Sequence, residues 1–486
     1  MSRRRIRHRT MKRHALTLIF ALTAIAGWAV VWMQSQQRPA TTRTLSIPPP
    51  QSPAEPSSNG TPALFSLFPL DAPGLEGAAI GFCLLGPDGD PIHESPLSRT
   101  ALAPASALKT VTTATALDLL GPDFRFETQL RSTAKPDAAG TITGNLVLVG
   151  AGDPTLTRDQ LIAMVDKLAA QGVKSITGGL TIDTSVFPHD PMSEHWNWGD
   201  VGNAYGVGAF GVNLNHNVMN IRLKPGRAPG DAASISAHFP TLPDLTWINQ
   251  LRTGTPGSGD GVIVYSEPYG RRITLRGTIP PGDEFSVRAA FPDPPALADF
   301  TLREALKKLG IRLGNAPSNK KSASHILATH RSAPLPAIIR HCHQVSDNLE
   351  AQCLFLTVGN TTGKNPVESI RSHWKSKGVN FTAWRLLDGS GLARANMIRP
   401  LDLARINHFA RKSRHGQIFY ESLNASSDGS VRSKLGAMSG VRSDTGFIRK
   451  PDGTILTFAL IGNGLGPQAD FWALRHRLVA EAKQLP

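Results

Sequence analysis

A serine and a lysine three residues apart, Ser106 and Lys109, could together form an activated nucleophile. On a helix such residues share a face, with Cβ atoms about 5–6 Å apart. If burial and neighbouring cations lower the pKa of the lysine, its neutral amine can take the serine proton without a histidine. Ser106 also opens a helix of small residues, where backbone amides favour developing negative charge. The spacing alone does not identify a catalytic pair, because it recurs at Ser132/Lys135, Ser318/Lys321 and Ser372/Lys375.

Such a pair needs a second polar group that relays the proton to a leaving amine, and an amide that holds the substrate backbone. Ser346 and Asn348 offer both, in a segment (IIRHCHQVSDNLEAQCLF) that predicts helices broken at this point. The flanking His341 and His343 could suggest a metal site. Residues two apart on a helix face different ways, so we expect no metal there.

A third element would be a cation beside the substrate, on the edge of a strand. Lys434 precedes a strand expected over residues 440–448, and Gly436 would let a substrate approach the backbone closely. Each of these three short motifs is weak by itself, and their order along the chain makes them informative.

The elements that must position these residues follow from hydrophobic and turn patterns. Pro104 and the pair Gly121-Pro122 frame a helix of about four turns. Residues 130–295 are rich in strand patterns, interrupted by one helix after a capping box at Thr157. Two further strands, 440–448 and 454–461, and a helix from Asp470 complete the chain.

The N-terminus has a different character. Residues 1–14 carry seven Lys or Arg and no acid, residues 15–33 are nineteen uncharged residues, and residues 34–62 include seven prolines. Nineteen residues at 1.5 Å each suffice to cross a bilayer core of about 30 Å. We therefore expect a basic cytoplasmic head, an uncleaved signal-anchor in the cytoplasmic membrane and a semi-extended linker, with the body exported or, if the segment is cleaved, secreted.

The remaining composition excludes some functions. The net charge of +15 is unevenly placed, because the basic head carries +7 and the other 472 residues only +8, which is a poor footprint for nucleic acid. We expect Cys83, Cys342 and Cys353 to be buried thiols, because the last two, if they share a helix, lie about 16 Å apart along its axis. No phosphate loop, paired-cysteine metal site or dinucleotide motif is present, and no cofactor is expected.

Longer stretches of the sequence resemble a known family, the class C low-molecular-mass penicillin-binding proteins. The stretches are PASALKTVTTATAL (104–117), GNLVLVGAGDPTL (144–156), WNWGDVGNAYGVGAFGVNLNHN (196–217), SDNLEAQCLF (346–355), LLDGSGLARANMIRP (386–400) and SKLGAMSGVRSDTGF (433–447). The family's members are D-alanyl-D-alanine carboxypeptidases and endopeptidases of peptidoglycan. The 240 residues between Ser106 and Ser346 also resemble this family, whose transpeptidase-like domain is interrupted by insertions.

The resemblance implies an α/β (α+β) penicillin-recognising, β-lactamase-like catalytic domain built from residues 63–129 and 325–486. Residues 130–324 would form inserted β-rich subdomains. Peptidoglycan stem peptides would be the substrate, and β-lactams would be covalent inhibitors.

The resemblance also assigns roles to single residues. Ser106 would be the acylated nucleophile and Lys109 its base, and Ser346 would relay the proton. The substrate would be bound by Asn348, Lys434, Gly436 and Ala437, with the backbone N–H groups of Ser106 and Ala437 as the oxyanion hole. Asp388 and Ser390 match a family signature to which the residues alone assign no chemical role.

The sequence departs from the family at Leu435, where a threonine is usual, and at Ala437, where a threonine or serine is usual. Those hydroxyls would help to grip the terminal carboxylate of D-alanyl-D-alanine, and a charged group that loses a hydrogen bond can lose about 1.5–3 kcal/mol of binding. We therefore expect weakened carboxypeptidase action and a larger share of endopeptidase action.

Two alternatives stay open. One is an inactive homologue that binds peptidoglycan or a partner, and the other is a serine β-lactamase or esterase.

Overall fold

The computed structural model describes residues 74–316 and 323–485. The expected head, signal-anchor and linker (1–14, 15–33 and 34–62) lie outside these residues. Among the described helices, none combines the length and the apolar character needed to cross a membrane.

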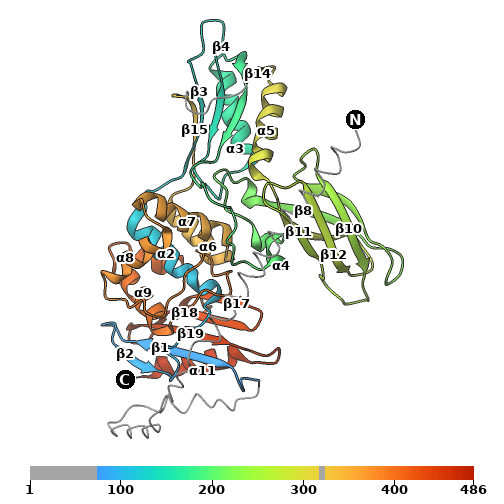
Figure 1. The fold of residues 1–486 in the computed structure, drawn as a ribbon. Coiled ribbons are helices and arrows are strands. Elements are labelled where there is room, and N and C mark those ends of the chain that lie inside the picture. The colour runs from blue at the N-terminus through green and yellow to red at the C-terminus, as the bar shows by residue number, and fades with distance from the viewer. Residues whose placement is uncertain (1–73, 317–322, 486) are drawn as a thin grey trace, which may run out of the picture. The chain divides into compact units, whose positions relative to one another are not determined.

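A six-stranded antiparallel sheet brings the two ends of the described chain together (Figure 1). In spatial order its strands are β16 (Asn424–Ala425), β17 (Val431–Met438), β18 (Val441–Arg449), β19 (Ile455–Asn463), β1 (Ala79–Leu85) and β2 (Pro91–Glu94). Strand β1 pairs with β19 from Ala79 opposite Asn463 to Leu85 opposite Thr457. The strand and helix expectations at the C-terminus are thereby confirmed, to within two residues at each end of the strands.

Both faces of this sheet are covered, which explains why β1 reads as a continuous apolar run. Ile80, Phe82 and Leu84 pack into a cluster with helix α11 (Phe471–Gln484). Cys83 and Leu85 face the opposite cluster, which includes apolar residues of the helices. Figure 1 shows α11 on one side of the sheet and α2 and α9 on the other.

The helices on that second side surround one buried helix, α2 (Lys109–Leu120). The surrounding helices are α6 (Leu335–Val345), α7 (Asn348–Thr362), α8 (Pro366–Lys375), α9 (Pro400–Lys412) and α10 (Gly416–Ser422). Every residue of α2 from Lys109 to Leu117 is buried. Its threonines fit this environment because their hydroxyls donate to carbonyls, as Thr115 does to Val111 at 2.7 Å. A short 3-10 helix, η2 (Ala105–Leu108), leads into α2 and carries Ser106.

Between the two halves of this body the chain forms four smaller sheets. Their strands are β3 (Glu127–Ser132), β4 (Thr141–Ile142), β5 (Leu146–Val149), β6 (Ser175–Gly178), β7 (Leu180–Asp183), β8 (Val218–Lys224), β9 (Ser234–Phe239), β10 (Thr246–Thr253), β11 (Ile263–Ser266), β12 (Arg272–Ile279), β13 (Phe285–Ala290), β14 (Arg312–Ala316) and β15 (His325–Arg331). The helices of this part are α3 (Arg158–Ala170), α4 (Trp198–Val201), α5 (Pro294–Lys308) and the 3-10 turns η3 (Ala204–Gly206) and η4 (Asn215–Asn217).

One apolar core holds much of this part together, and it draws all its residues from positions 130–328. The capping box at Thr157 is present, since Thr157 accepts from Gln160 N and Gln160 caps in return. Within the strand-rich region that the sequence predicts, residues 141–150 and 175–183 each form two short strands. The domain limits at 130 and 324 stay a prediction.

The chain breaks between α6 and α7, as the sequence indicated. Ser346 adopts a left-handed conformation (φ 62°), and Asp347 then caps α7 by accepting a hydrogen bond from Glu350 N at 2.9 Å. The break also separates Cys342 from Cys353, which lie on α6 and α7 and do not share a helix. All three cysteines are free and buried, as predicted.

Candidate active site

Ser106 lies at the start of the buried helix, with its side chain only partly covered. The preceding Ala105 has a positive φ of 46°, which turns the chain sharply into η2. Gly391 allows this turn to pack closely, because a Cβ atom there would lie 1.9 Å from the Ala105 carbonyl oxygen. The chain neighbours of Ser106, namely Ala105, Ala107 and Leu108, are fully buried, so packing on both sides fixes the position of the serine.

Lys109 is buried directly beneath Ser106. Its Nζ atom lies 2.9 Å from Ser106 Oγ, 2.5 Å from Asn348 Oδ1 and 2.8 Å from the Ser390 carbonyl oxygen. All three partners are uncharged, and burial lowers the pKa of Lys109 below its usual range. A neutral amine in hydrogen-bond reach of a serine hydroxyl is the arrangement that general-base activation requires.

Ser346 comes from the break between α6 and α7 and meets the second lysine of the site. Lys434 Nζ donates to Ser346 Oγ at 3.0 Å and to the Leu435 carbonyl oxygen at 2.8 Å. Burial, with repulsion from Lys109 next in size, lowers the pKa of Lys434 to about 7. A lysine with that pKa can hold or release a proton near neutral pH, through a hydroxyl that already accepts its hydrogen bond.

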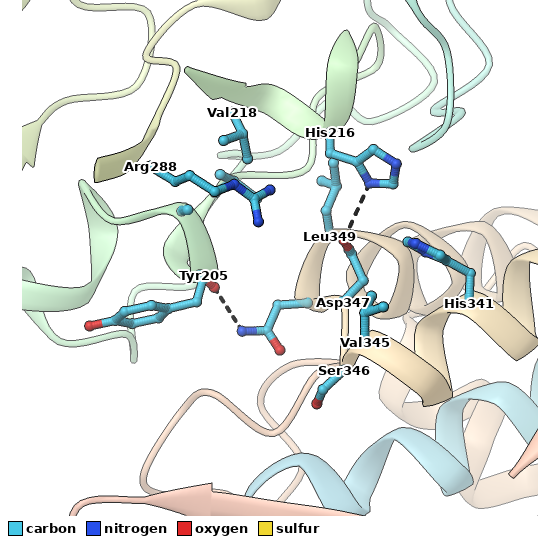
Figure 2. Close-up of a pocket in the computed structure, with 12 residues that line it drawn as sticks. Tyr205, His216, Val218, Arg288, His341, Val345, Ser346, Asp347 and Leu349 are labelled. Carbon is cyan, nitrogen blue, oxygen red and sulfur yellow. Dashed lines mark hydrogen bonds and ion pairs between the residues drawn. The ribbon is translucent and has the colours of Figure 1, made fainter. Parts of the chain in front are cut away.

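Asn348 joins the site to the part of the chain between β3 and β15. Its Oδ1 atom accepts from Lys109, and its Nδ2 atom donates to the Tyr205 carbonyl oxygen at 2.7 Å. Asp347, between the two site residues, is turned away from them toward His216 (Figure 2). The break between the helices therefore sends Ser346 and Asn348 to one side and Asp347 to the other.

Gly436 brings strand β17 against the turn that carries Ser106. A Cβ atom at Gly436 would lie 2.7 Å from the Pro104 carbonyl oxygen and 2.8 Å from Ala107 N, so a side chain has no room there. The next residue, Ala437, is exposed. Strand β16 pairs only with Arg432 and Ser433, so within the described sheet the rest of β17 is an open edge, as the sequence suggested for Lys434.

Leu435 stands on this open edge with 42% of its surface exposed. The side chain at this position therefore faces the solvent side of β17, while Lys434 and Gly436 are buried. Leucine offers no hydrogen-bond donor there, which is the departure noted in the sequence.

Asp388 has a structural role that the sequence alone did not show. Its buried carboxylate accepts hydrogen bonds from the backbone N–H groups of Ser390 (2.9 Å), Gly391 (2.6 Å) and Ala393 (2.6 Å), and from the indole of Trp196 (2.8 Å). These bonds fix a tight turn. The turn presents the Ser390 carbonyl to Lys109. An aspartate among glycines and serines indicates such a turn in the sequence. The contact of the Ser390 carbonyl with Lys109 joins residues far apart in the chain, so the sequence does not indicate it.

A cavity of about 490 Å³ opens beside Ser346 and Asn348 (Figure 2). Its walls come from helices α6 and α7 and from the part of the chain between β3 and β15, which contributes Tyr205, His216 and Arg288. The cavity is wide enough to admit a peptide-sized group next to the site.

The two histidines beside the break lie in different surroundings. His343 is buried and shares hydrogen bonds with Thr113 Oγ1 and Ser422 Oγ, both at 2.9 Å. His341 faces Glu350 instead. The two side chains therefore have different hydrogen-bond partners.

Comparison with known proteins decides the family. The D-Ala-D-Ala carboxypeptidase 3 (S13) family matches residues 68–484. The chain belongs to this family. It is a serine D-Ala-D-Ala carboxypeptidase of peptidoglycan, with the penicillin-recognising fold that the sequence indicated. Its substrate places its activity in the cell envelope.

Individual relatives support this assignment. The chain is 27% identical to D-alanyl-D-alanine carboxypeptidase DacB of Haemophilus influenzae, over 80% of this chain and 86% of that protein. It is 28% identical to the D-alanyl-D-alanine carboxypeptidase of Actinomadura sp. strain R39, over 81% and 79% of the two proteins.

The fold has solved counterparts as well. The crystal structure of penicillin binding protein 4 from H. influenzae superposes with a TM-score of 0.75 at 24% identity, covering 84% of this chain and 97% of that one. The same protein in complex with a β-lactam gives a TM-score of 0.69 at 23% identity, with the same coverage.

Proposed function

We propose that Ser106 is the nucleophile of this carboxypeptidase and that Lys109 is its general base. The observation that carries the proposal is the 2.9 Å contact between Lys109 Nζ and Ser106 Oγ, made by a buried lysine whose partners are all uncharged. The hydroxyl oxygen attacks the carbonyl between the two D-alanines while its proton passes to Lys109. The backbone N–H groups of Ser106 and Ala437 stabilise the oxyanion, and one such donor is worth about 3 kcal/mol.

Collapse of the tetrahedral intermediate expels the terminal D-alanine, whose nitrogen needs a proton. Ser346 supplies it from its hydroxyl and is reprotonated by Lys434, which lies 3.0 Å away. Water then hydrolyses the acyl-enzyme by the same route in reverse. Asn348 binds the peptide backbone once substrate displaces its contact with the Tyr205 carbonyl.

We propose that β-lactams acylate the same serine, as inhibitors that mimic the terminal dipeptide. The H. influenzae relative has been solved with a β-lactam, which supports this proposal. Leu435 weakens the grip on a terminal carboxylate, so endopeptidase cleavage of cross-links takes a larger share of turnover than in relatives with a hydroxyl there.

The activity is tested with the purified full-length chain and a pentapeptide that ends in D-Ala-D-Ala. Released D-alanine is measured for the wild type, for Ser106→Ala and for Ser372→Ala, a matched control because Ser372 also precedes a lysine by three residues. We expect release from the wild type and Ser372→Ala and none from Ser106→Ala. Release by Ser106→Ala at the wild-type rate would contradict the proposal.

We further propose that residues 15–33 anchor the chain in the cytoplasmic membrane and that residues 130–324 are inserted subdomains. The uncharged nineteen-residue stretch behind a basic head supports the first proposal. Alkaline extraction of membranes tests it: the full chain stays in the pellet, and a chain lacking residues 1–62 does not. Recovery of the full chain in the soluble fraction would contradict the anchor.

A further inference from the structure

Four side chains with metal-ligating atoms meet on the far side of the turn between α6 and α7, away from Ser106. His341, Asp347 and Glu350 each offer one ligand atom, and these atoms lie within 4.8 Å of one another. His216, from the inserted part, approaches the same group. Its Nδ1 atom lies 3.2 Å from Asp347 Oδ2, as Figure 2 shows, and its ring centroid lies 5.5 Å from that of His341.

Glu350 points to a missing partner in this cluster. Its side chain is only 1% exposed, and its Oε1 atom lies 2.8 Å from His341 Nδ1. Its Oε2 atom is buried and has no hydrogen-bond partner among the described residues. A carboxylate oxygen buried in this way is costly unless something binds it.

The two remaining ligands each keep one atom available. Asp347 Oδ1 is used to cap α7, but Oδ2 faces His216. His216 is held in place by three successive residues with positive φ, from Asn215 to Asn217. The distance of 3.2 Å between its Nδ1 atom and Asp347 Oδ2 is close to the separation of two ligands on a tetrahedral ion with bonds of about 2.0–2.1 Å.

We propose that this cluster is a binding site for one divalent transition-metal ion, with Zn²⁺ as the best fit. His341, Asp347 and Glu350 are its ligands, and His216 completes a tetrahedral set. Two imidazoles with two carboxylates suit zinc, whereas Mg²⁺ and Ca²⁺ prefer oxygen ligands alone. The ion reaches the site through the cavity beside Ser346, because His216, His341 and Asp347 line it and His341 is 47% exposed.

An ion at this site would also connect two parts of the chain. Asp347 stands between Ser346 and Asn348, and His216 belongs to the inserted part, so one ion would tie this part to the turn that carries two site residues. The ion performs no step of the peptidase reaction in this arrangement. It stabilises the folded chain by mass action, because it binds the native state.

Metal binding itself is the test, with no activity involved. The full-length chain is stripped with a chelator, and Zn²⁺ is titrated by calorimetry. The same chain is then titrated with Co²⁺, whose visible absorption reports a tetrahedral site. We expect one ion per chain, and an affinity for Zn²⁺ reduced at least about 100-fold in His341→Ala and Glu350→Gln, since outer-shell partners alone are worth ~10–100-fold.

His476→Ala is the matched control, because His476 is an exposed histidine on α11 and should leave the affinity unchanged. Zn²⁺ should also raise the melting temperature of the wild type but not of His341→Ala, whose half-exposed side chain can be removed without unfolding the chain. Absence of stoichiometric Zn²⁺ binding to the wild type would overturn the proposal. So would Zn²⁺ binding of full affinity by both His341→Ala and Glu350→Gln.

Discussion

Lys434 Nζ lies 3.0 Å from Ser346 Oγ, which links the open edge of β17 to the break between α6 and α7. Lys109 makes the corresponding contact with Ser106 at 2.9 Å. The site thus contains two serine–lysine pairs, one at the start of α2 and one between a strand and a helix turn. Burial lowers the pKa of Lys109, which favours the neutral form that a general base needs, and burial together with repulsion from Lys109 lowers the pKa of Lys434.

Removal of the base should slow acylation. Lys109→Met keeps the apolar stem but has no amine, so we expect the rate of acylation by a fluorescent penicillin to fall by about 10²–10⁴-fold. Lys135→Met is the control, because Lys135 follows a serine by three residues but is exposed. Similar rates for Lys109→Met and the wild type would contradict the role of Lys109.

The pKa of Lys434, lowered to about 7, predicts a pH dependence of substrate recognition. As pH rises through this value Lys434 loses its charge, so kcat/KM for a substrate with a terminal carboxylate should fall above about pH 7. The fall should be absent in Lys434→Met and smaller for an uncharged ester. A profile of Lys434→Met that matches the wild type would show that another group titrates.

The lowered pKa of Lys434 also makes the free energy of unfolding depend on pH. In the unfolded chain a lysine titrates near about 10.4, so the folded state binds this proton more weakly. The resulting cost, on the order of a few kcal/mol, is fully present below about pH 7 and disappears above about pH 10.4. Lys434→Met should therefore gain most in free energy of unfolding at pH 6 and least at pH 10, as measured by urea denaturation. An equal difference at both pH values would contradict this prediction.

Leu435→Thr should raise carboxypeptidase turnover. The new hydroxyl can donate to the substrate carboxylate, and a hydrogen bond to a charged group is worth about 1.5–3 kcal/mol, or roughly 10-fold or more in kcat/KM. Leu435→Val is the matched control, since valine has the shape of threonine without the hydroxyl. An equal gain from both substitutions would attribute the effect to shape alone.

Asp388 is a positioning residue, because it holds the turn that presents the Ser390 carbonyl to Lys109. Asp388→Asn places an amide NH₂ against backbone N–H donors, so we expect a loss of about 1–3 kcal/mol in the free energy of unfolding and slower penicillin acylation. Asp402→Asn is the control, because Asp402 is an equally buried aspartate that accepts from an indole, that of Trp384. It should lose stability but keep its acylation rate when folded. An unchanged acylation rate in Asp388→Asn would leave Asp388 with a structural role only.

Local signals predicted much of the catalytic framework. Proline and glycine at its ends framed the helix that begins at Lys109, and the polar break at Ser346 and Asp347 divided α6 from α7. Both depend on residues close in the chain, where turn chemistry and capping decide the outcome.

Contacts between residues far apart in the chain could not be predicted from the sequence. The Ser390 carbonyl contacts Lys109 across 281 residues, and the Trp196 indole reaches Asp388 across 192. No spacing rule relates such positions. The cluster of His341, Asp347, Glu350 and His216 could not be predicted for the same reason: His343 is the neighbour of His341 in the sequence, whereas the spatial neighbours of His341 are Glu350 and His216.

Intact-protein mass spectrometry after incubation with penicillin tests directly whether Ser106 forms the acyl-enzyme. We expect one penicilloyl group per chain, located by proteolysis on the peptide that contains Ser106 and absent from Ser106→Ala. An unmodified wild-type chain, or an adduct on any other serine, would show that Ser106 is not the nucleophile.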